Sequence, residues 1–440
     1  MNGISSPSAP ALDVPARFMG LSIAALAVAA LSAPWTLPLV QGPLGAFSLL
    51  ALVHLLTLGF VGAMLIGASY QLVPVALGAR LSSVGVARAS FWAYAGGLTL
   101  FLGGLARAWT PALAAGGILL GVAFLMYAAV VGATWWRAAH HDVIAWHILL
   151  GLIAALAGMS LGVALAVNKG TGLLGGRLPG VLGAHVVMML AGWVGLTFFG
   201  VAYRLVAMFT LAEMAFLPSL AWLELALVGG GTSLLALRAV LGLPVAVAQV
   251  GAALLLAGVV AFVAGLRRLY GRRMRRGIDV HMPFAISAAA MAIAAAALLL
   301  AGLVPAVPMN RPPWIAAGWL AIPGVAGTAI QGFFYKIATF LVWLRRYAPV
   351  AGTRPVPRLE DLYSRRLALA GWALWTSAVV GGAAVILLDV LTMTLVAVPL
   401  LAGTACFLVN IAAIARHWAM GGPRGTDVPH AAAARARPLA

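Results

Sequence analysis

Long apolar runs, separated by short polar segments, follow one another along almost the whole chain. Twelve such runs lie at residues 18–40, 45–72, 90–108, 111–135, 143–167, 180–208, 216–237, 243–266, 283–307, 314–344, 367–389 and 391–415. A helix needs roughly 20 apolar residues to cross a bilayer, and each run is about that long or longer. The pattern therefore predicts an all-α integral membrane protein with twelve transmembrane helices.

The basic residues predict the orientation of these helices. If the N-terminus lies inside, the inner segments hold 22 of the 27 Lys and Arg residues. The outer segments hold the other five, Arg107, Lys169, Arg177, Arg238 and Arg311. Because Lys and Arg concentrate in cytoplasmic loops, this asymmetry predicts that both termini are cytoplasmic. The expected location is an inner (cytoplasmic) membrane of the bacterial type.

Composition and charge exclude other classes of protein. Hydrophobic residues make up 64% of the chain and charged residues only 8%, with a mean hydropathy of +1.07. A soluble domain is about 25% charged, so a water-soluble protein is excluded. The net charge of +18 is explained by basic loops that meet anionic lipid, and no nucleic-acid partner is expected. The single cysteine, Cys406, excludes a disulfide framework and a cysteine-based zinc site.

The chain divides into a membrane domain and two tails. Residues 1–17 are predicted to form a polar N-terminal tail, and residues 18–418 the twelve-helix membrane domain. Residues 419–440 are rich in Gly, Pro, Ala and Arg, so we expect a disordered cytoplasmic tail.

A glycine frame recurs in the second, sixth and tenth apolar runs. It reads GxxGxxxxGxxY and begins at Gly59, Gly192 and Gly324, which lie 133 and 132 residues apart. Each step to the next copy crosses four helices. The internal repeat predicts three pseudo-symmetric four-helix arcs in parallel orientation, over about 18–135, 143–266 and 283–415.

Two histidines in the apolar runs are candidate cofactor ligands. His54 precedes Gly59 by five residues and His185 precedes Gly192 by seven, so the two share a depth but not a helix face. A neutral imidazole is a good ligand for haem iron or copper. Such a ligand needs a second hydrogen bond to fix its tautomer, and Thr57 is the local candidate for His54. A role as hydrogen-bonded packing residues stays open for both histidines.

Two methionines could extend the site at His185. Met188 and Met189 follow it by three and four positions, and their thioether sulfurs are soft ligands for copper or haem iron. A core-filling role is the alternative, because methionine is a common gap-filler in apolar helices.

Glu224 is the one acid well inside an apolar run. It is predicted to pair with a neighbouring helix, to stay protonated or to relay protons, in either a structural or a proton-linked role. The sequence has no P-loop, GxSxG or HExxH motif, so nucleotide or soluble-type hydrolase chemistry has no support.

Twelve helices in three arcs, with His on the second and sixth and an inner N-terminus, resemble the catalytic subunit I of haem–copper oxidases, a superfamily of oxygen and nitric oxide reductases. The resemblance implies that His54 is an axial ligand of a low-spin haem and that His185 is a copper ligand. The architecture also resembles the NnrS-type membrane proteins, which have twelve spans, bind haem and copper and are linked to nitric oxide stress.

The chain departs from the oxidase pattern at two places. The seventh run carries Glu224 instead of the adjacent copper-ligating histidines of that family. The tenth run, which supplies axial histidines in the family, contains no histidine, and Trp319 stands at the position that matches His54. The usual dinuclear reducing centre therefore cannot be assembled, and whether the chain is an enzyme stays open.

The expected function is that of a divergent haem- or copper-binding membrane protein in a redox, oxygen- or nitric-oxide-related or metal-handling role. Its expected partners are the lipid bilayer and other membrane or cytochrome subunits. Two other hypotheses stay open. A small-solute or metal transporter would use the few intramembrane polar residues, Glu224, Gln249 and Asn410, whereas a structural or assembly protein would have kept the fold without cofactors.

Overall fold

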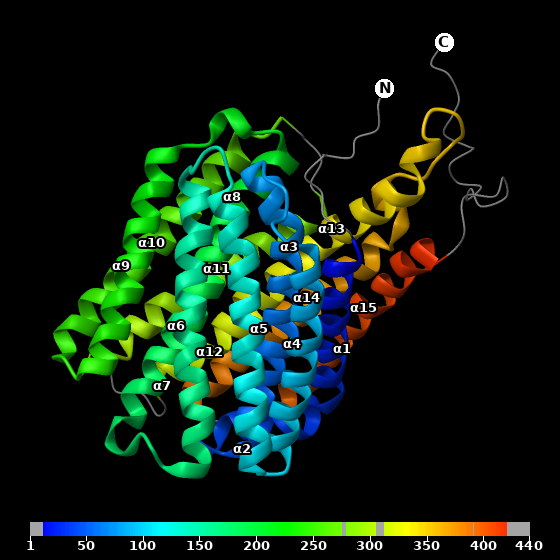
Figure 1. Cartoon of the computed structure of the whole chain (residues 1–440). Helices are drawn as coiled ribbons and strands as arrows, with labels where there is room; N and C mark the ends of the chain where they lie inside the picture. Colours follow the sequence, from blue (N-terminus) through cyan, green and yellow to red (C-terminus); the bar gives the residue numbers. More distant parts are fainter. Residues whose placement is uncertain (1–11, 275–278, 305–311, 390, 420–440) are drawn as a thin grey trace.

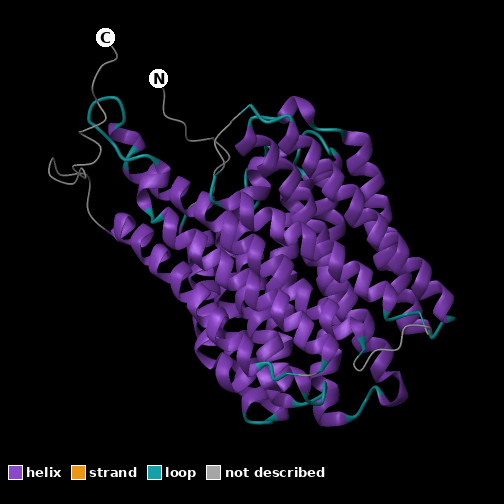
Figure 2. Ribbon diagram, turned by 180° about the vertical axis from the view of Figure 1, so that it is seen from behind, coloured by secondary structure: helices purple, strands orange, loops and turns teal. Residues whose placement is uncertain are grey.

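The computed structural model describes residues 12–274, 279–304, 312–389 and 391–419, and this part of the chain is helical, with no strands (Figure 2). The predicted C-terminal tail lies almost wholly outside the described residues. The N-terminal tail is shorter than predicted, because the first helix begins at Asp13 instead of residue 18. The Asp13 carboxylate stabilises this start, since it accepts hydrogen bonds from Arg88 and lies 3.7 Å from Arg17.

Twelve helices in the described ranges are long and apolar enough to cross a membrane, as the sequence predicts. They identify the chain as a multi-pass membrane protein. Nine are single α-helices, the first continued by a short 3₁₀ turn: α1 (Asp13–Thr36), α4 (Val84–Ala106), α5 (Thr110–Trp136), α6 (Val143–Thr171), α9 (Pro218–Leu241), α10 (Val245–Gly271), α11 (His281–Ala301), α14 (Arg365–Leu388) and α15 (Thr394–Ala419).

The other three spans are composite, and each joins two α-helices through a π-helical segment. They are α2 (Phe47–His54), η2 (Leu55–Gly62) and α3 (Ala63–Leu77); α7 (Leu178–Val187), η4 (Met188–Leu196) and α8 (Thr197–Thr210); and α12 (Pro313–Trp319), η6 (Leu320–Gly327) and α13 (Thr328–Arg346). The π-helical segments begin 133 and 132 residues apart, the same offsets as the glycine frame. The first two glycines of each frame lie inside the π-helical segment, so the frame marks where these spans widen.

Nine helices form a ring around the three composite spans. Each contacts the next in the order α1, α4, α5, α6, α9, α10, α11, α14 and α15, and α15 contacts α1 again. Figure 1 shows this closure, with the first and last helices side by side. Inside the ring, η2 and η4 each contact η6, so the π-helical segments meet near the centre.

Helix ends follow ordinary capping rules. The side chains of Ser83, Asp142 and Ser364 accept a hydrogen bond from the backbone N–H three residues on, at the starts of α4, α6 and α14. Gly172 and Gly242 end α6 and α9 in the left-handed conformation, which glycine adopts without steric cost. These signals fix the short connections that separate the spans.

Neighbouring ring helices approach closely through small residues. A Cβ added to Gly97 of α4 would lie 2.9 Å from the backbone nitrogen of Leu120 in α5. In the same way, a Cβ on Gly231 of α9 would lie 2.6 Å from the carbonyl oxygen of Gly251 in α10. In a membrane, association of helices depends on such close backbone packing, because lipid removes the hydrophobic driving force.

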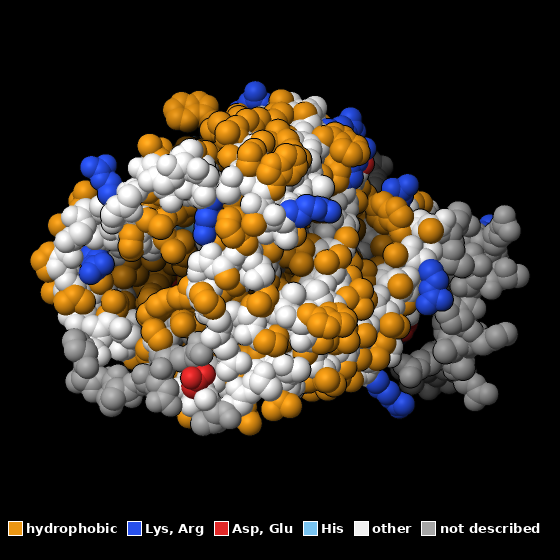
Figure 3. All heavy atoms as spheres, turned by 90° about the horizontal axis from the view of Figure 1, so that it is seen from below, with side chains coloured by type: hydrophobic (Ala, Val, Ile, Leu, Met, Phe, Trp, Pro, Cys, Tyr) orange, Lys and Arg blue, Asp and Glu red, His pale blue; other side chains and the backbone are white. Residues whose placement is uncertain are grey.

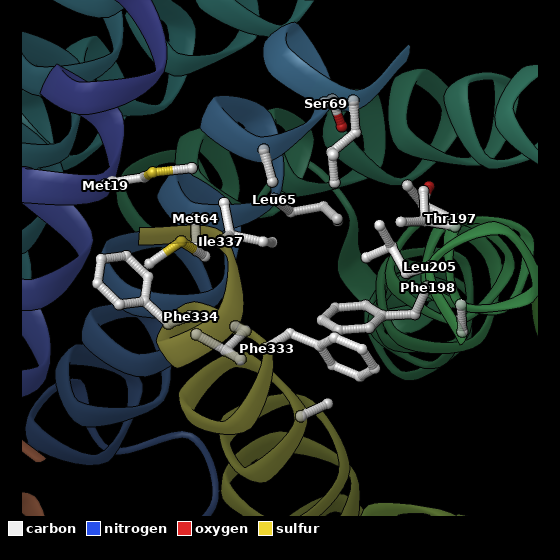
Figure 4. A pocket seen from close by; sticks show the side chains of 16 residues that line it. Met19, Met64, Leu65, Ser69, Thr197, Phe198, Leu205, Phe333, Phe334 and Ile337 are labelled. Atoms are coloured by element: carbon white, nitrogen blue, oxygen red, sulfur yellow. The ribbon is translucent and has the colours of Figure 1, made fainter. Parts of the chain in front are cut away.

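A small apolar cavity of about 70 Å³ lies where α3, α8 and α13 meet (Figure 4). Apart from Met19 of α1, its lining consists of triplets with one residue from each of the three helices: Met64, Thr197 and Ala329; Leu65, Phe198 and Ile330; Ala68, Val201 and Phe333; Ser69, Ala202 and Phe334; and Leu72, Leu205 and Ile337. The residues of each triplet are again 133 and 132 positions apart. The three composite spans therefore turn corresponding faces toward a common axis.

The two ends of the bundle differ in charge. Because the number of spans is even, α1 begins and α15 ends at the same end of the bundle, and the loops rich in arginine lie there. Figure 3 shows the opposite end, on which hydrophobic and uncharged side chains predominate and basic side chains are scattered.

Candidate functional site

His54 is the last residue of α2, where the second span changes from α-helix to π-helix. Its Nδ1 lies 2.8 Å from the carbonyl oxygen of Leu50. Since a carbonyl only accepts, Nδ1–H donates, and the neutral ring keeps its lone pair on Nε2. The predicted partner Thr57 is wrong, because its hydroxyl donates to the carbonyl of Val53 at 2.8 Å, as threonine often does within a helix.

His185 on α7 is held in the same tautomer by a neighbouring helix. Its Nδ1–H donates to the carbonyl oxygen of Gly158 in α6, at 2.8 Å. Gly162, one turn further along α6, leaves room for the ring, because a Cβ there would lie 2.8 Å from the Cε1 of His185. A backbone carbonyl therefore sets the tautomer, and a glycine makes the space.

The structure brings His54 and His185 together. Their ring centres are 6.5 Å apart and the ring planes differ by 23°. In the described part of the chain, no protein group hydrogen-bonds to Nε2 of either ring. Two imidazoles on one metal ion lie roughly 6 Å apart, from about 2 Å for each metal–nitrogen bond and about 1 Å from each nitrogen to its ring centre. The observed separation of the ring centres, 6.5 Å, is close to this value.

Met188 and Met189 both lie against α6, the helix whose Gly158 carbonyl accepts the hydrogen bond from His185. The Sδ of Met189 would be 2.7 Å, and the Cβ of Met188 3.2 Å, from a Cβ placed on Gly158. A thioether is therefore close to the residue whose carbonyl anchors the ring. Among the described residues, no three His, Cys, Asp or Glu side chains lie together as a metal-binding group. Imidazole and thioether, the groups that these histidines and methionines carry, are ligand types suited to copper.

The haem-binding arrangement implied by the oxidases does not fit these residues. At the tenth-span position that matches His54, Trp319 is buried and its Nε1–H donates to the carbonyl of Val379 at 2.8 Å. Its indole lies against Gly382 of α14, where a Cβ would come 2.7 Å from Nε1. An indole fills the place of the second axial ligand, so no haem is held between the second and tenth spans by a histidine pair.

Glu224 lies apart from this pair and has a partner that the sequence analysis did not assign. Its Oε2 is 2.8 Å from Nε2 of His147 on α6, and both side chains are fully buried. The pair could have been predicted from the similar distance of the two residues from the starts of their helices. His147 is the fifth residue of α6 and Glu224 the seventh of α9. The prediction that Glu224 pairs with a neighbouring helix is confirmed.

No protein-family model and no curated protein matches this chain.

Proposed function

We propose that this membrane protein binds a copper ion between His54 and His185, in a redox or metal-handling role. The observation that carries the proposal is the pair of near-parallel rings 6.5 Å apart, each with Nδ1–H tied to a carbonyl and with Nε2 left for a ligand. A backbone hydrogen bond of this kind is the usual second-shell contact of a metal-binding histidine. Met188 and Met189 supply the soft sulfur that favours copper.

A low-spin haem would need the same two nitrogens and room for a macrocycle as well. The Phe101 ring lies 5.0 Å from the His54 ring, and the His185 ring lies directly against Gly162. These close neighbours favour a single ion over a haem. An absorption spectrum of the purified protein distinguishes the two cofactors.

Three four-helix units are the architecture that best accounts for the fold. The closed ring of helices, the equal offsets of the π-helical segments and the triplets around the axial cavity all support it. Each unit would contribute three helices to the ring and one composite span to the centre. In this arrangement, His54 and His185 come from the central spans of the first and second units.

We further propose that both termini face the cytoplasm of a cell with a bacterial-type inner membrane, because the basic residues gather at their end of the bundle. His54 and His185 then lie in the outer half of the membrane. Copper would reach the pair from the outer side, where a cytochrome or another membrane subunit could exchange electrons with it.

The transporter hypothesis has weaker support from the structure. Its three intramembrane polar residues satisfy separate helix contacts: Gln249 donates to the carbonyl of Leu303, Asn410 donates to the carbonyl of Ser364, and Glu224 contacts His147. A structural or assembly role without a cofactor is the outcome if the site binds no metal.

The test is metal analysis and a reduced-minus-oxidised absorption spectrum of the purified, detergent-solubilised protein. The proposal predicts near-stoichiometric copper and no haem band. A sharp haem band at stoichiometric amount would replace copper by haem at the same histidines. A folded protein that takes up neither group, even when Cu(I) is supplied, would contradict the proposal and leave the assembly role.

A further inference from the structure

His147 stands at a position where the other two predicted units carry phenylalanine. In each unit, the third glycine of the frame packs against the first helix, and the frame tyrosine faces the ring found there. The glycine, ring and tyrosine are Gly67, Phe18 and Tyr70; Gly200, His147 and Tyr203; and Gly332, Phe284 and Tyr335. The ring-to-tyrosine distances are 5.8, 6.1 and 6.1 Å. Packing alone is therefore satisfied by an apolar ring, and the imidazole calls for another explanation.

The His147–Glu224 contact holds one proton. Nδ1–H of His147 donates to the carbonyl of Val143 at 2.7 Å, so the 2.8 Å contact between Nε2 and Oε2 needs a proton of its own. The proton sits either on the imidazole, opposite a carboxylate, or on the carboxylic acid, opposite a neutral imidazole. Both forms are neutral overall, which suits a pair with no exposed surface.

A third group lies next to this pair. The Tyr203 hydroxyl of α8 lies next to the Glu224 carboxylate, and Glu224 Oε1 and the hydroxyl are both buried with no other hydrogen-bond partner among the described residues. In the first unit, the corresponding Tyr70 hydroxyl is satisfied by Ser90 at 2.8 Å. The second unit thus carries a carboxyl group and an imidazole where a serine hydroxyl and an apolar ring are enough for packing in the first unit.

Among the described residues, the groups beside the Glu224 carboxylate are His147 of α6, which hydrogen-bonds to it, and Tyr203 of α8, whose ring lies 6.1 Å from the His147 ring. The neighbouring α10 presents Phe262 and Gly265 to Tyr203, so it adds no charge there. The proton on the pair is therefore governed by these three side chains.

We propose that His147, Glu224 and Tyr203 form an intramembrane proton-binding site, loaded and unloaded from the end of the bundle where α6 and α9 begin. His147 and Glu224 lie within about 10 Å of those helix starts, at 1.5 Å per residue. On unloading, the proton leaves the Nε2–Oε2 contact, and a neutral imidazole and a carboxylate remain. On loading, the proton returns to the same contact. The site is independent of the copper centre.

The chain offers a clean spectroscopic test, because Glu213, Glu224 and Glu360 are its only glutamates. The E213Q/E360Q variant removes the two exposed ones and leaves Glu224 alone. Infrared spectra of this variant, labelled with ¹³C-glutamate and free of metal, would be recorded from about pH 5 to about pH 9 in H₂O and D₂O. Full-length protein in lipid vesicles would be used throughout.

We expect the labelled carboxyl band to change reversibly between low and high pH, as the proton enters and leaves the Nε2–Oε2 contact, and to shift in D₂O. H147F should fix the band in the acid form, and Y203F should move the midpoint of the conversion. The H147F/E224S variant reproduces the arrangement of the first unit and serves as the folded control without the site. A band that is the same at every pH and insensitive to D₂O in the folded protein would overturn the proposal.

Discussion

His54 and His147 lie in two regions of the molecule, and the same kind of backbone hydrogen bond holds both rings. The two regions differ in the groups that surround the ring. In both, Nδ1–H donates to the carbonyl four residues earlier, so each ring has the same tautomer when neutral. His54 is half-buried and its ring lies 6.5 Å from the His185 ring, whereas His147 is fully buried and its Nε2 meets a carboxyl group. The group opposite Nε2 therefore decides whether an intramembrane histidine is suited to a metal ion or to a proton.

Removal of His54 or His185 should have the largest effect, which is on copper binding. We expect H54A and H185A each to weaken Cu(I) binding by more than about 100-fold, since loss of a second-shell partner alone costs about 10–100-fold. Competition with a chelator of known affinity measures the change. H140A is the matched control, because His140 is exposed in a loop and should leave copper affinity unchanged.

Removal of one member of the His147–Glu224 pair should destabilise the protein instead. E224A leaves Nε2 of His147 buried without a partner, and we expect it to lower the free energy of unfolding by about 3 kcal/mol. Copper affinity should not change. Denaturation in detergent measures the first effect, and H147F/E224S should stay within about 1 kcal/mol of the parent because both partners are replaced. If E224A and H147F/E224S lowered the free energy of unfolding equally, an unpartnered His147 would not be the cause of the loss in E224A.

A change beside the His185 ring should have an intermediate effect on metal binding. In G162A, the new Cβ displaces the His185 ring, which strains its hydrogen bond to Gly158, and copper affinity should fall about tenfold. G103A is the control, since a Cβ at Gly103 meets no atom within 4 Å. If G162A binds copper like the parent protein, the ring position does not matter for the site.

The smallest effect is expected at Thr57. Because its hydroxyl bonds to Val53 and not to His54, T57V should leave copper affinity within about twofold of the parent. A loss as large as that of H54A, measured by the same chelator competition, would show that the Leu50 carbonyl is not the anchor.

The spans were predictable, because length and hydropathy alone decide which segments can cross a bilayer. The twelve predicted runs match the twelve helices to within a few residues, apart from larger shifts at a few helix ends such as Asp13, where an ion pair extends the helix beyond the apolar run. The π-helical segments could not be predicted, because a helix period gives no sign of a wider turn, although the glycine frame lies in the three spans that carry them.

The sites were predictable only as separate residues. His54, His185 and Glu224 could be singled out, since a polar side chain in an apolar run is unusual. Their partners depend on tertiary packing: Gly158 and His147 lie on α6, far from the residues they contact in sequence. A backbone carbonyl has no signature in the sequence. The sequence therefore suggests the Thr57 hydroxyl as the partner of His54, whereas the actual partner is the carbonyl of Leu50.

X-ray absorption at the copper edge of Cu(I)-loaded protein tests the central claim most directly. The account predicts two imidazole scatterers in the parent protein and one in H54A and in H185A at a copper concentration that still loads the variants. Unchanged spectra in both variants, or a copper site without imidazole, would show that the open Nε2 atoms of this pair do not hold the metal.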